Sequence, residues 1–160
     1  MSDAFLVEAK NEYHSETMRQ IRNICREYMT QNKEYISEDD QALWFNYVYS
    51  KHRDKGEMVA YLVADPVDSH AIVWIGYGII RKKLGNWYLT AGLYDTDRGL
   101  GHGRKTFELL QEEVKARGAG EVWLDVLETN TVARSLYEKL GFVETGRMPK
   151  VITMRKVFND

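Results

Sequence analysis

Two spacings of apolar residues alternate along the chain, and each predicts one kind of element. Continuous or β-branched apolar runs are typical of strands, whereas apolar residues three or four positions apart predict helices with one buried face. Glycine follows two helical stretches, at Gly118 and Gly141, where it commonly ends a helix. Strands are expected at residues 4–9, 58–64, 71–80, 87–94, 121–127, 142–145 and 151–158, and helices at 14–30, from Ser37 onward, from the loop near residue 101 to about 117, and at 131–140.

Three local details complete this assignment. Residues 65–69 are expected to form the turn of a hairpin between the second and third strands. The helix that Ser37 caps is expected to carry Trp44, Tyr47 and Val48 on one side. The buried face of the first helix is expected to comprise Met18, Ile21, Cys25, Tyr28 and Met29.

The order of the elements, β-α-α-β-β-β-α-β-α-β-β, defines the expected fold class. Helices alternate with strands only in part, which favours a mixed sheet with helices on both faces over a doubly wound parallel sheet. The class is therefore α/β in the broad sense, or α+β mixed. No repeat, low-complexity tract or linker divides the chain, so residues 1–160 are expected to form a single domain.

Composition and charge exclude several partners. The net charge is -2 and the longest basic run is residues 81–83, so no nucleic-acid partner is expected. The single cysteine, Cys25, cannot form an internal disulfide, and no histidine stands at ligand spacing, so no metal site is expected. The lone cysteine favours a reducing, cytoplasmic setting. The sequence shows no signal peptide and no apolar run long enough to cross a membrane.

A glycine-rich loop at residues 98–104 (RGLGHGR) predicts an anion site. It joins a strand to a helix, whose first N–H groups lack internal partners and carry partial positive charge. Alternate glycines let the backbone approach a phosphate, and an arginine stands at each end. A tight turn using positive φ explains one glycine better than three. The P-loop pattern is absent, and Arg104 replaces the third glycine of GxGxxG, which disfavours nucleoside triphosphates and NAD.

Two motifs resemble those of the GNAT (Gcn5-related N-acetyltransferase) family. Residues 98–103 resemble its pyrophosphate loop, R/Q-x-x-G-x-G/A. A second pattern, N-x-x-A-x-x-x-Y-x-x-x-G-F, is matched by Asn130, Ala133, Tyr137, Gly141 and Phe142. The element order also resembles that family, whose fold implies a mostly antiparallel sheet of about seven strands. The resemblance implies transfer of an acetyl group from acetyl-CoA, as cosubstrate, to a primary amine.

The resemblance also implies roles for individual residues. Strand 87–94 would splay from strand 121–127, and the backbone N–H of Leu93 would face the thioester carbonyl. Tyr137 would be the general acid, although a core tyrosine on the apolar face of its helix would look the same. Asn130 could bind coenzyme A, cap its helix, or do both. The remaining expected cofactor contacts are Arg98, Gly99, Leu100, Gly101, His102, Gly103, Arg104 and Ala133, with the His102 side chain facing solvent.

The general base and the acceptor are less defined. Family members often carry an acidic residue on the strand equivalent to 87–94, which has none here, so Asp95 and Glu128 are the candidates. For each, a solvated or capping carboxylate is the alternative. The acceptor is expected to be a small molecule or a peptide.

The segment Ile21-Arg22-Asn23, together with the Gln-x-x-Trp-Phe run at residues 41–45, is faintly similar to GNAT enzymes that acetylate amino-sugar nucleotides. The resemblance also allows a homodimer. A non-catalytic acyl-CoA-binding domain of the same fold is the alternative function.

Overall fold

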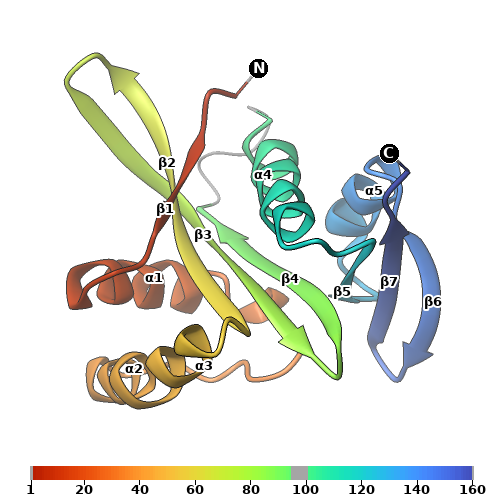
Figure 1. The fold of residues 1–160 in the computed structure, drawn as a ribbon, viewed down its shortest axis with the longest axis horizontal. Coiled ribbons are helices and arrows are strands. Elements are labelled where there is room, and N and C mark those ends of the chain that lie inside the picture. Colours follow the sequence, from red (N-terminus) through yellow and green to blue (C-terminus); the bar gives the residue numbers. More distant parts are fainter. Residues whose placement is uncertain (1, 95–100, 160) are drawn as a thin grey trace.

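The structure, a computed structural model, describes residues 2–94 and 101–159, and its strands form a seven-stranded sheet in the order β1-β2-β3-β4-β5-β7-β6 (Figure 1). Neighbouring strands are antiparallel except β4 and β5, which are parallel. The strands are β1 (Phe5–Glu8), β2 (Met58–Asp68), β3 (Ala71–Lys83), β4 (Asn86–Leu93), β5 (Glu121–Leu127), β6 (Val143–Met148) and β7 (Val151–Val157). The helices are α1 (Glu12–Ile24), α2 (Glu38–Leu43), α3 (Ser50–Asp54), α4 (His102–Ala116) and α5 (Thr131–Lys139).

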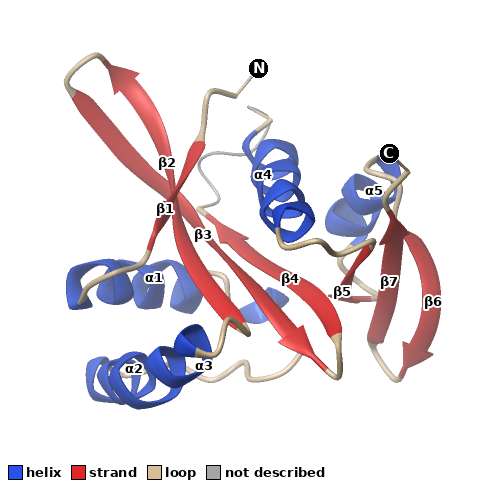
Figure 2. Cartoon of the chain, viewed as in Figure 1, coloured by secondary structure: helices blue, strands red, loops and turns tan. Residues whose placement is uncertain are grey.

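Helices cover both faces of this sheet, as expected from the element order (Figure 2). On one face, Met18 and Ile21 of α1 pack with Leu62 and Tyr77 of the sheet. On the other face, residues of α4 and α5 pack against buried side chains of β3, β4, β5 and β7. We refer to these as the α1 face and the α4 face. The mixed α/β class with a seven-stranded, mostly antiparallel sheet is confirmed.

A glycine in β3 allows α4 to approach the sheet closely. A Cβ atom at Gly78 would lie 2.8 Å from Cδ1 and 2.9 Å from Cδ2 of Leu110, a fully buried residue of α4. Such distances are shorter than carbon atoms tolerate, so the spacing between α4 and β3 depends on glycine at this position.

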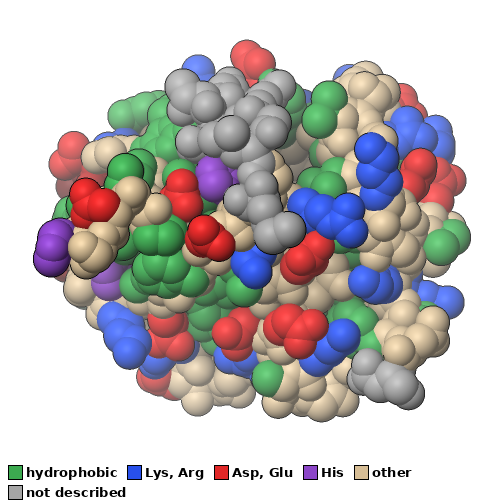
Figure 3. Space-filling model, turned by 90° about the horizontal axis from the view of Figure 1, so that it is seen from above, with side chains coloured by type: hydrophobic (Ala, Val, Ile, Leu, Met, Phe, Trp, Pro, Cys, Tyr) green, Lys and Arg blue, Asp and Glu red, His purple; other side chains and the backbone are tan. Residues whose placement is uncertain are grey.

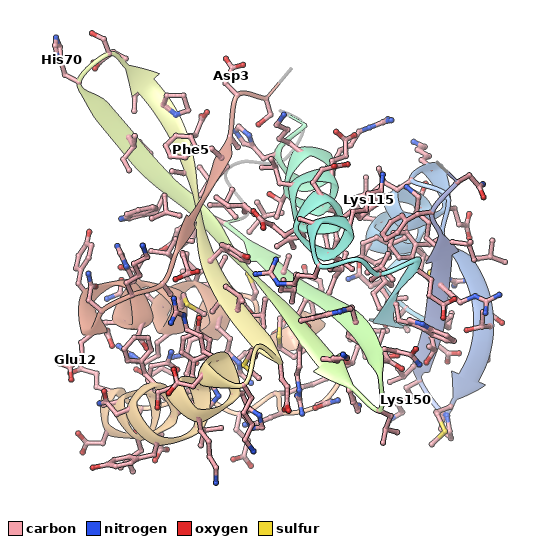
Figure 4. All side chains as sticks on the ribbon, in the orientation of Figure 1. Asp3, Phe5, Glu12, His70, Lys115 and Lys150 are labelled. Carbon is pink, nitrogen blue, oxygen red and sulfur yellow. The ribbon has the colours of Figure 1, made fainter. Side chains whose placement is uncertain are left out.

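The hairpin between β2 and β3 is longer than expected. Residues 65–68 were expected in a turn but continue β2, so that Ser69 and His70 alone separate the two strands. The tip projects from the body of the protein, with His70 at its end (Figure 4). Pro66 is tolerated because β1 pairs with β2 only as far as Ala64, and beyond that point β2 is an edge strand.

The helical region after Ser37 also differs from the expectation. Ser37 caps α2 through its Oγ, which accepts from the N–H of Asp40 at 3.1 Å. A π-helical segment follows at Trp44–Tyr49 and changes the periodicity, so that Tyr49 rather than Tyr47 returns to the buried side. Tyr47 is 73% exposed and Val48 is also exposed, whereas Tyr49 is 2% exposed. The expected face of Trp44, Tyr47 and Val48 is therefore wrong.

The first helix is shorter than the expected span of 14–30. It begins after Asn11, whose side chain accepts from the N–H of His14, and it ends at Ile24. A 3₁₀ turn at Arg26–Tyr28 follows and leaves Tyr28 exposed rather than on the buried face.

The surface carries charges of both signs. On the face shown in Figure 3, acidic and basic side chains are interspersed with apolar ones. In the part of the chain that the structure describes, no helix is long and apolar enough to cross a membrane.

Candidate functional site

The cleft of this protein lies where β4 and β5 separate. The two strands are joined by a ladder pair at Tyr88 and Trp123 and diverge toward their carboxyl ends. The cavity that results has a volume of about 1100 Å³ and is lined from both faces of the sheet. It is bordered by the end of α1 and the loop after it, by β4, by the first turn of α4, and by β5 and α5. The divergence agrees with the splay that the family resemblance implies.

The exposed edge of β4 presents backbone groups to this cleft. The N–H of Tyr94 donates to the carbonyl of Ile75 on β3 at 3.0 Å, and Leu93 lies opposite Gly76. Because successive residues of a strand direct their backbone groups to opposite sides, the N–H of Leu93 points away from β3 and toward the cleft. The carbonyl of Leu93 also points away from β3 and accepts from the buried Cys25 thiol at 3.1 Å.

The first turn of α4 closes one end of the cleft with helix N–H groups. Gly101 is the N-cap, with φ of 80°, and it has no side chain to cap the helix. Among the described residues no side chain caps these first N–H groups, as is typical of an anion site. The positive φ shows that the turn itself requires glycine at 101. A Cβ at Gly103 would only make ordinary contact with Leu136 and Leu93 on the inner side, at 3.5 and 3.6 Å.

Part of the predicted loop cannot be assessed in this structure. Arg98, Gly99, Leu100 and the candidate base Asp95 lie outside the described residues. Of the remaining loop residues, Gly101, His102, Gly103 and Arg104 all line the cleft. The guanidinium of Arg104 is exposed and pairs with Glu108 at 2.9 Å.

The expectation that the His102 side chain faces solvent is wrong. His102 is only 5% exposed, and its Nδ1 lies 2.7 Å from Oγ of Ser2. Its Nε2 lies 3.6 Å from a carboxylate oxygen of Asp65 on β2. The N-terminal segment and the extended β2 strand cover the start of α4, a long-range contact that no local sequence pattern indicates.

Residues of the second motif lie on the α4 side of the cleft. Tyr137 packs edge-on against Phe107 and Phe142, at ring-centroid distances of 4.9 and 6.1 Å. Burial raises the pKa of its hydroxyl, which therefore stays protonated at neutral pH. The side chain of Asn130 caps α5 by accepting from the N–H of Ala133 at 3.3 Å. Three of the five motif residues, Tyr137, Asn130 and Ala133, line the cleft.

The carboxylates near the cleft are not arranged as the sequence suggested. Glu128 is not among the lining residues, and its carboxylate lies 3.3 Å from the guanidinium of Arg147 on β6. The N–H of Glu128 donates to the carbonyl of Lys150, which lies in the turn between β6 and β7 and is labelled in Figure 4. The structure therefore does not bring Glu128 into the site.

Asp125 does line the cleft, and the sequence reasoning missed it. It lies on β5 two residues after Trp123, and its Oδ1 accepts from the hydroxyl of Thr153 at 2.7 Å. Burial, and then the charge of Asp125, raise the pKa of Tyr88 on the facing strand. The signal was present in EVWLDVL: Val122, Leu124 and Val126 are buried on the α4 face, so Asp125 points to the α1 face.

The segment that faintly resembled sugar-nucleotide enzymes has a structural role. The side chain of Asn23 accepts from the N–H of Ile36 and donates to its carbonyl, each at 2.9 Å. The guanidinium of Arg22 donates to the carbonyls of Asn32 and Glu34. Together these contacts fix the loop after α1 against the mouth of the cleft. Among the described residues, no group of His, Cys, Asp and Glu is placed to hold a metal ion.

Comparison with known proteins agrees with this geometry. The model of the acetyltransferase (GNAT) family matches residues 10–142, and the chain belongs to that family. A curated relative, the ribosomal protein bS18-alanine N-acetyltransferase of Haemophilus ducreyi, is 36% identical over 56 residues, which cover 35% of this chain and 34% of the relative. The chain thus matches about a third of the length of such curated relatives.

Solved structures resemble nearly the whole chain. The apo structure of FdhC, a nucleotide-linked sugar GNAT, has a TM-score of 0.77 at 16% identity, over 96% of this chain and 86% of that one. The RimL ribosomal L7/L12 alpha-N-protein acetyltransferase in complex with coenzyme A has a TM-score of 0.78 at 13% identity, over 96% and 93%. These likenesses confirm the expected GNAT fold.

Proposed function

We propose that this chain transfers an acetyl group from acetyl-CoA to the primary amine of a small molecule or a peptide, within the cleft between β4 and β5. The observation that carries this proposal is the divergence of these two strands. It brings an unpaired strand edge, a helix N-terminus, a tyrosine hydroxyl and a carboxylate to one cavity.

The residues present fit the cosubstrate. The free edge of β4 at Leu93 can pair with the amide groups of a pantetheine arm, as an added strand would. The first turn of α4 offers N–H groups to a pyrophosphate. The bound cosubstrate would supply the activated thioester. The name of the curated relative supports a peptide N-terminus as one class of acceptor.

Three groups of the chain would act on the reaction. The N–H of Leu93 donates to the thioester oxygen as that oxygen gains negative charge. Asp125 accepts a proton from the amine as the new N–C bond forms. Tyr137 gives its proton to the sulfur as the C–S bond breaks, and solvent then restores both protonation states. Asp125 points to the α1 face and Tyr137 lies on the α4 face, so the acceptor and the leaving thiol would occupy opposite sides of the cleft.

Binding of the cosubstrate is the first test. A ligand at 100 times its Kd stabilises a protein by about 2.7 kcal/mol, which shifts the Tm of a chain of this size by several degrees. Acetyl-CoA and coenzyme A should produce this shift, whereas ATP and NAD should not. Absence of a shift with either CoA species would overturn the proposal.

Turnover is the second test, read by thiol release with a panel of peptides, amino sugars, polyamines and amino acids. With the best amine, Asp125→Asn should lower kcat/KM by about 10²- to 10⁴-fold, while the KM for acetyl-CoA stays close to that of the wild type. Tyr137→Phe should lower kcat. Glu128→Gln is the matched control and should change kcat/KM less than twofold. Binding of acetyl-CoA without turnover of any amine would favour the non-catalytic alternative.

A further inference from the structure

The α1 face of the cleft carries basic side chains that no described carboxylate neutralises. Arg81 and Lys83 lie at alternate positions of β3, on the same side as Tyr77 and Ile79, which pack with α1. Both line the cleft. Among the described residues, neither forms an ion pair, although the ammonium of Lys83 lies 5.4 Å from the centroid of the Tyr88 ring.

Arg22, near the end of α1, is a third cation that lines the cleft. The guanidinium of Arg22 binds the backbone carbonyls of Asn32 and Glu34, which are neutral acceptors and leave its charge in place. Burial lowers the pKa of this guanidinium, as expected for a cation partly removed from water.

The described acidic residues of the cleft do not balance these charges. Among the described residues that line it, Asp125 is the only carboxylate, so one negative charge accompanies three cations on the α1 face. Two other lining cations, Arg104 and Lys139, belong to α4 and α5, the helices that pack on the α4 face. They are suited to the phosphates of the cosubstrate, whereas Arg22, Arg81 and Lys83 lie on the opposite face of the sheet.

We propose that the amine acceptor carries an anionic group, a carboxylate or a phosphate, which binds Arg81 and Lys83 while its amine faces Asp125. This inference rests on the proposed function and defines the substrate class of the same site. Arg81 lies opposite Tyr88 in the sheet, and Tyr88 lies opposite Trp123, two residues before Asp125. The Cα atoms of Arg81 and Asp125 are therefore about 12 Å apart or more. This Cα separation leaves room for an acceptor whose amine and anion are several bonds apart.

A series of six-carbon amines tests the charge requirement. The probes are 6-aminohexanoate, 6-aminohexyl phosphate, the neutral 6-aminohexanamide and the cationic 1,6-diaminohexane. Both anionic probes should have kcat/KM about tenfold or more above the neutral amide, and the preference should weaken as salt is raised. The ratio of kcat/KM between 6-aminohexanoate and 6-aminohexyl phosphate shows which anion is preferred. The same comparison is made by calorimetry on the protein saturated with coenzyme A, which does not require turnover.

Charge reversal identifies the residues. The double variant Arg81→Glu/Lys83→Glu should lose the preference for the anionic probes and gain on 1,6-diaminohexane, while the KM for acetyl-CoA stays unchanged. Lys82→Glu is the matched control, because Lys82 lies on the same strand but does not line the cleft. It should leave the preference intact.

Several results would overturn the inference. They are equal kcat/KM and equal binding across the four probes, an anion preference that survives the double variant, or a rise in the KM for acetyl-CoA with unchanged acceptor selectivity. The last result would assign these cations to the cosubstrate. Failure of the proposed function itself is distinguishable, because it is seen as the absence of a thermal shift with acetyl-CoA.

Discussion

Replacing Gly78 with alanine tests the close approach of α4 to the sheet. The new methyl group would lie 2.8–2.9 Å from both methyl carbons of Leu110. Leu110 is 0% exposed, so its side chain can turn away only by displacing other residues of the packed core. We therefore expect α4 to move outward from β3, together with the first turn that forms the proposed pyrophosphate site.

The size of the effect follows from two opposing contributions. Overpacking a well-packed core costs about 1–3 kcal/mol. Alanine in place of glycine also restricts the unfolded chain, which stabilises the protein by about 0.4–1 kcal/mol. The net loss for Gly78→Ala should be about 0.5–2 kcal/mol, or a fall in Tm of roughly 2–6 °C for a chain of this length. The KM for acetyl-CoA should rise at the same time.

Urea unfolding of four proteins provides the assay: wild type, Gly78→Ala, Leu110→Ala and the double variant. Leu110→Ala alone should cost about 2–5 kcal/mol, but it makes room for the new methyl group. The double variant should therefore lose less stability than the sum of the two single variants. Gly146→Ala is the control, since a Cβ there meets nothing within 4 Å, and it should be neutral or slightly stabilising. Additive losses would refute the steric reasoning.

Three further predictions concern stability. Tyr49→Phe leaves the N–H of Ala60 without its acceptor at 2.9 Å and should cost about 1–3 kcal/mol in urea unfolding; an unchanged midpoint would contradict it. Asn130→Ala should cost about 0.5–1 kcal/mol by removing the cap of α5, whereas Asn130→Ser should retain most of the stability. Burial raises the pKa of Tyr61 to about 12. The stability that this shift represents is fully present below pH 10, and the free energy of unfolding then falls as pH rises toward 12. The loss is about 1.4 kcal/mol at pH 11, and Tyr61→Phe should remove that part of the alkaline destabilisation.

Local signals were sufficient for most of the fold. The apolar spacing, the cap at Ser37 and the glycines at 118 and 141 depend on residues close in sequence, and the elements lie near the expected positions. The π-helical segment at Trp44–Tyr49 could not be predicted in this way, because a change from i+4 to i+5 hydrogen bonding leaves the same apolar composition.

The sequence predicted which residues line the cleft where a motif fixes the local geometry. It did not predict the positions that depend on contacts between distant segments. Tyr137, Asn130 and the first turn of α4 line the cleft, as the motif spacing implied. The burial of His102 depends on Ser2, which is 100 residues away in the chain. The position of Asp125 depends on which face of β5 is open, and that is set by the divergence from β4. The alternation in EVWLDVL predicts that Asp125 is on the α1 face, but it does not show that this face opens into the cleft.

The divergence of β4 and β5 divides the chain as well as the sheet. Everything on one side of the gap is built from residues before 117, and β5, α5, β6 and β7 form one continuous stretch, residues 121–157. With so little backbone pairing between them, the two parts are joined mainly by the buried core that α4 shares with β5 and β7, and native-state hydrogen exchange would measure how far their amides open as two groups with different opening free energies. A cosubstrate bound across the gap would couple the two units and raise the lower of these free energies toward that of global unfolding.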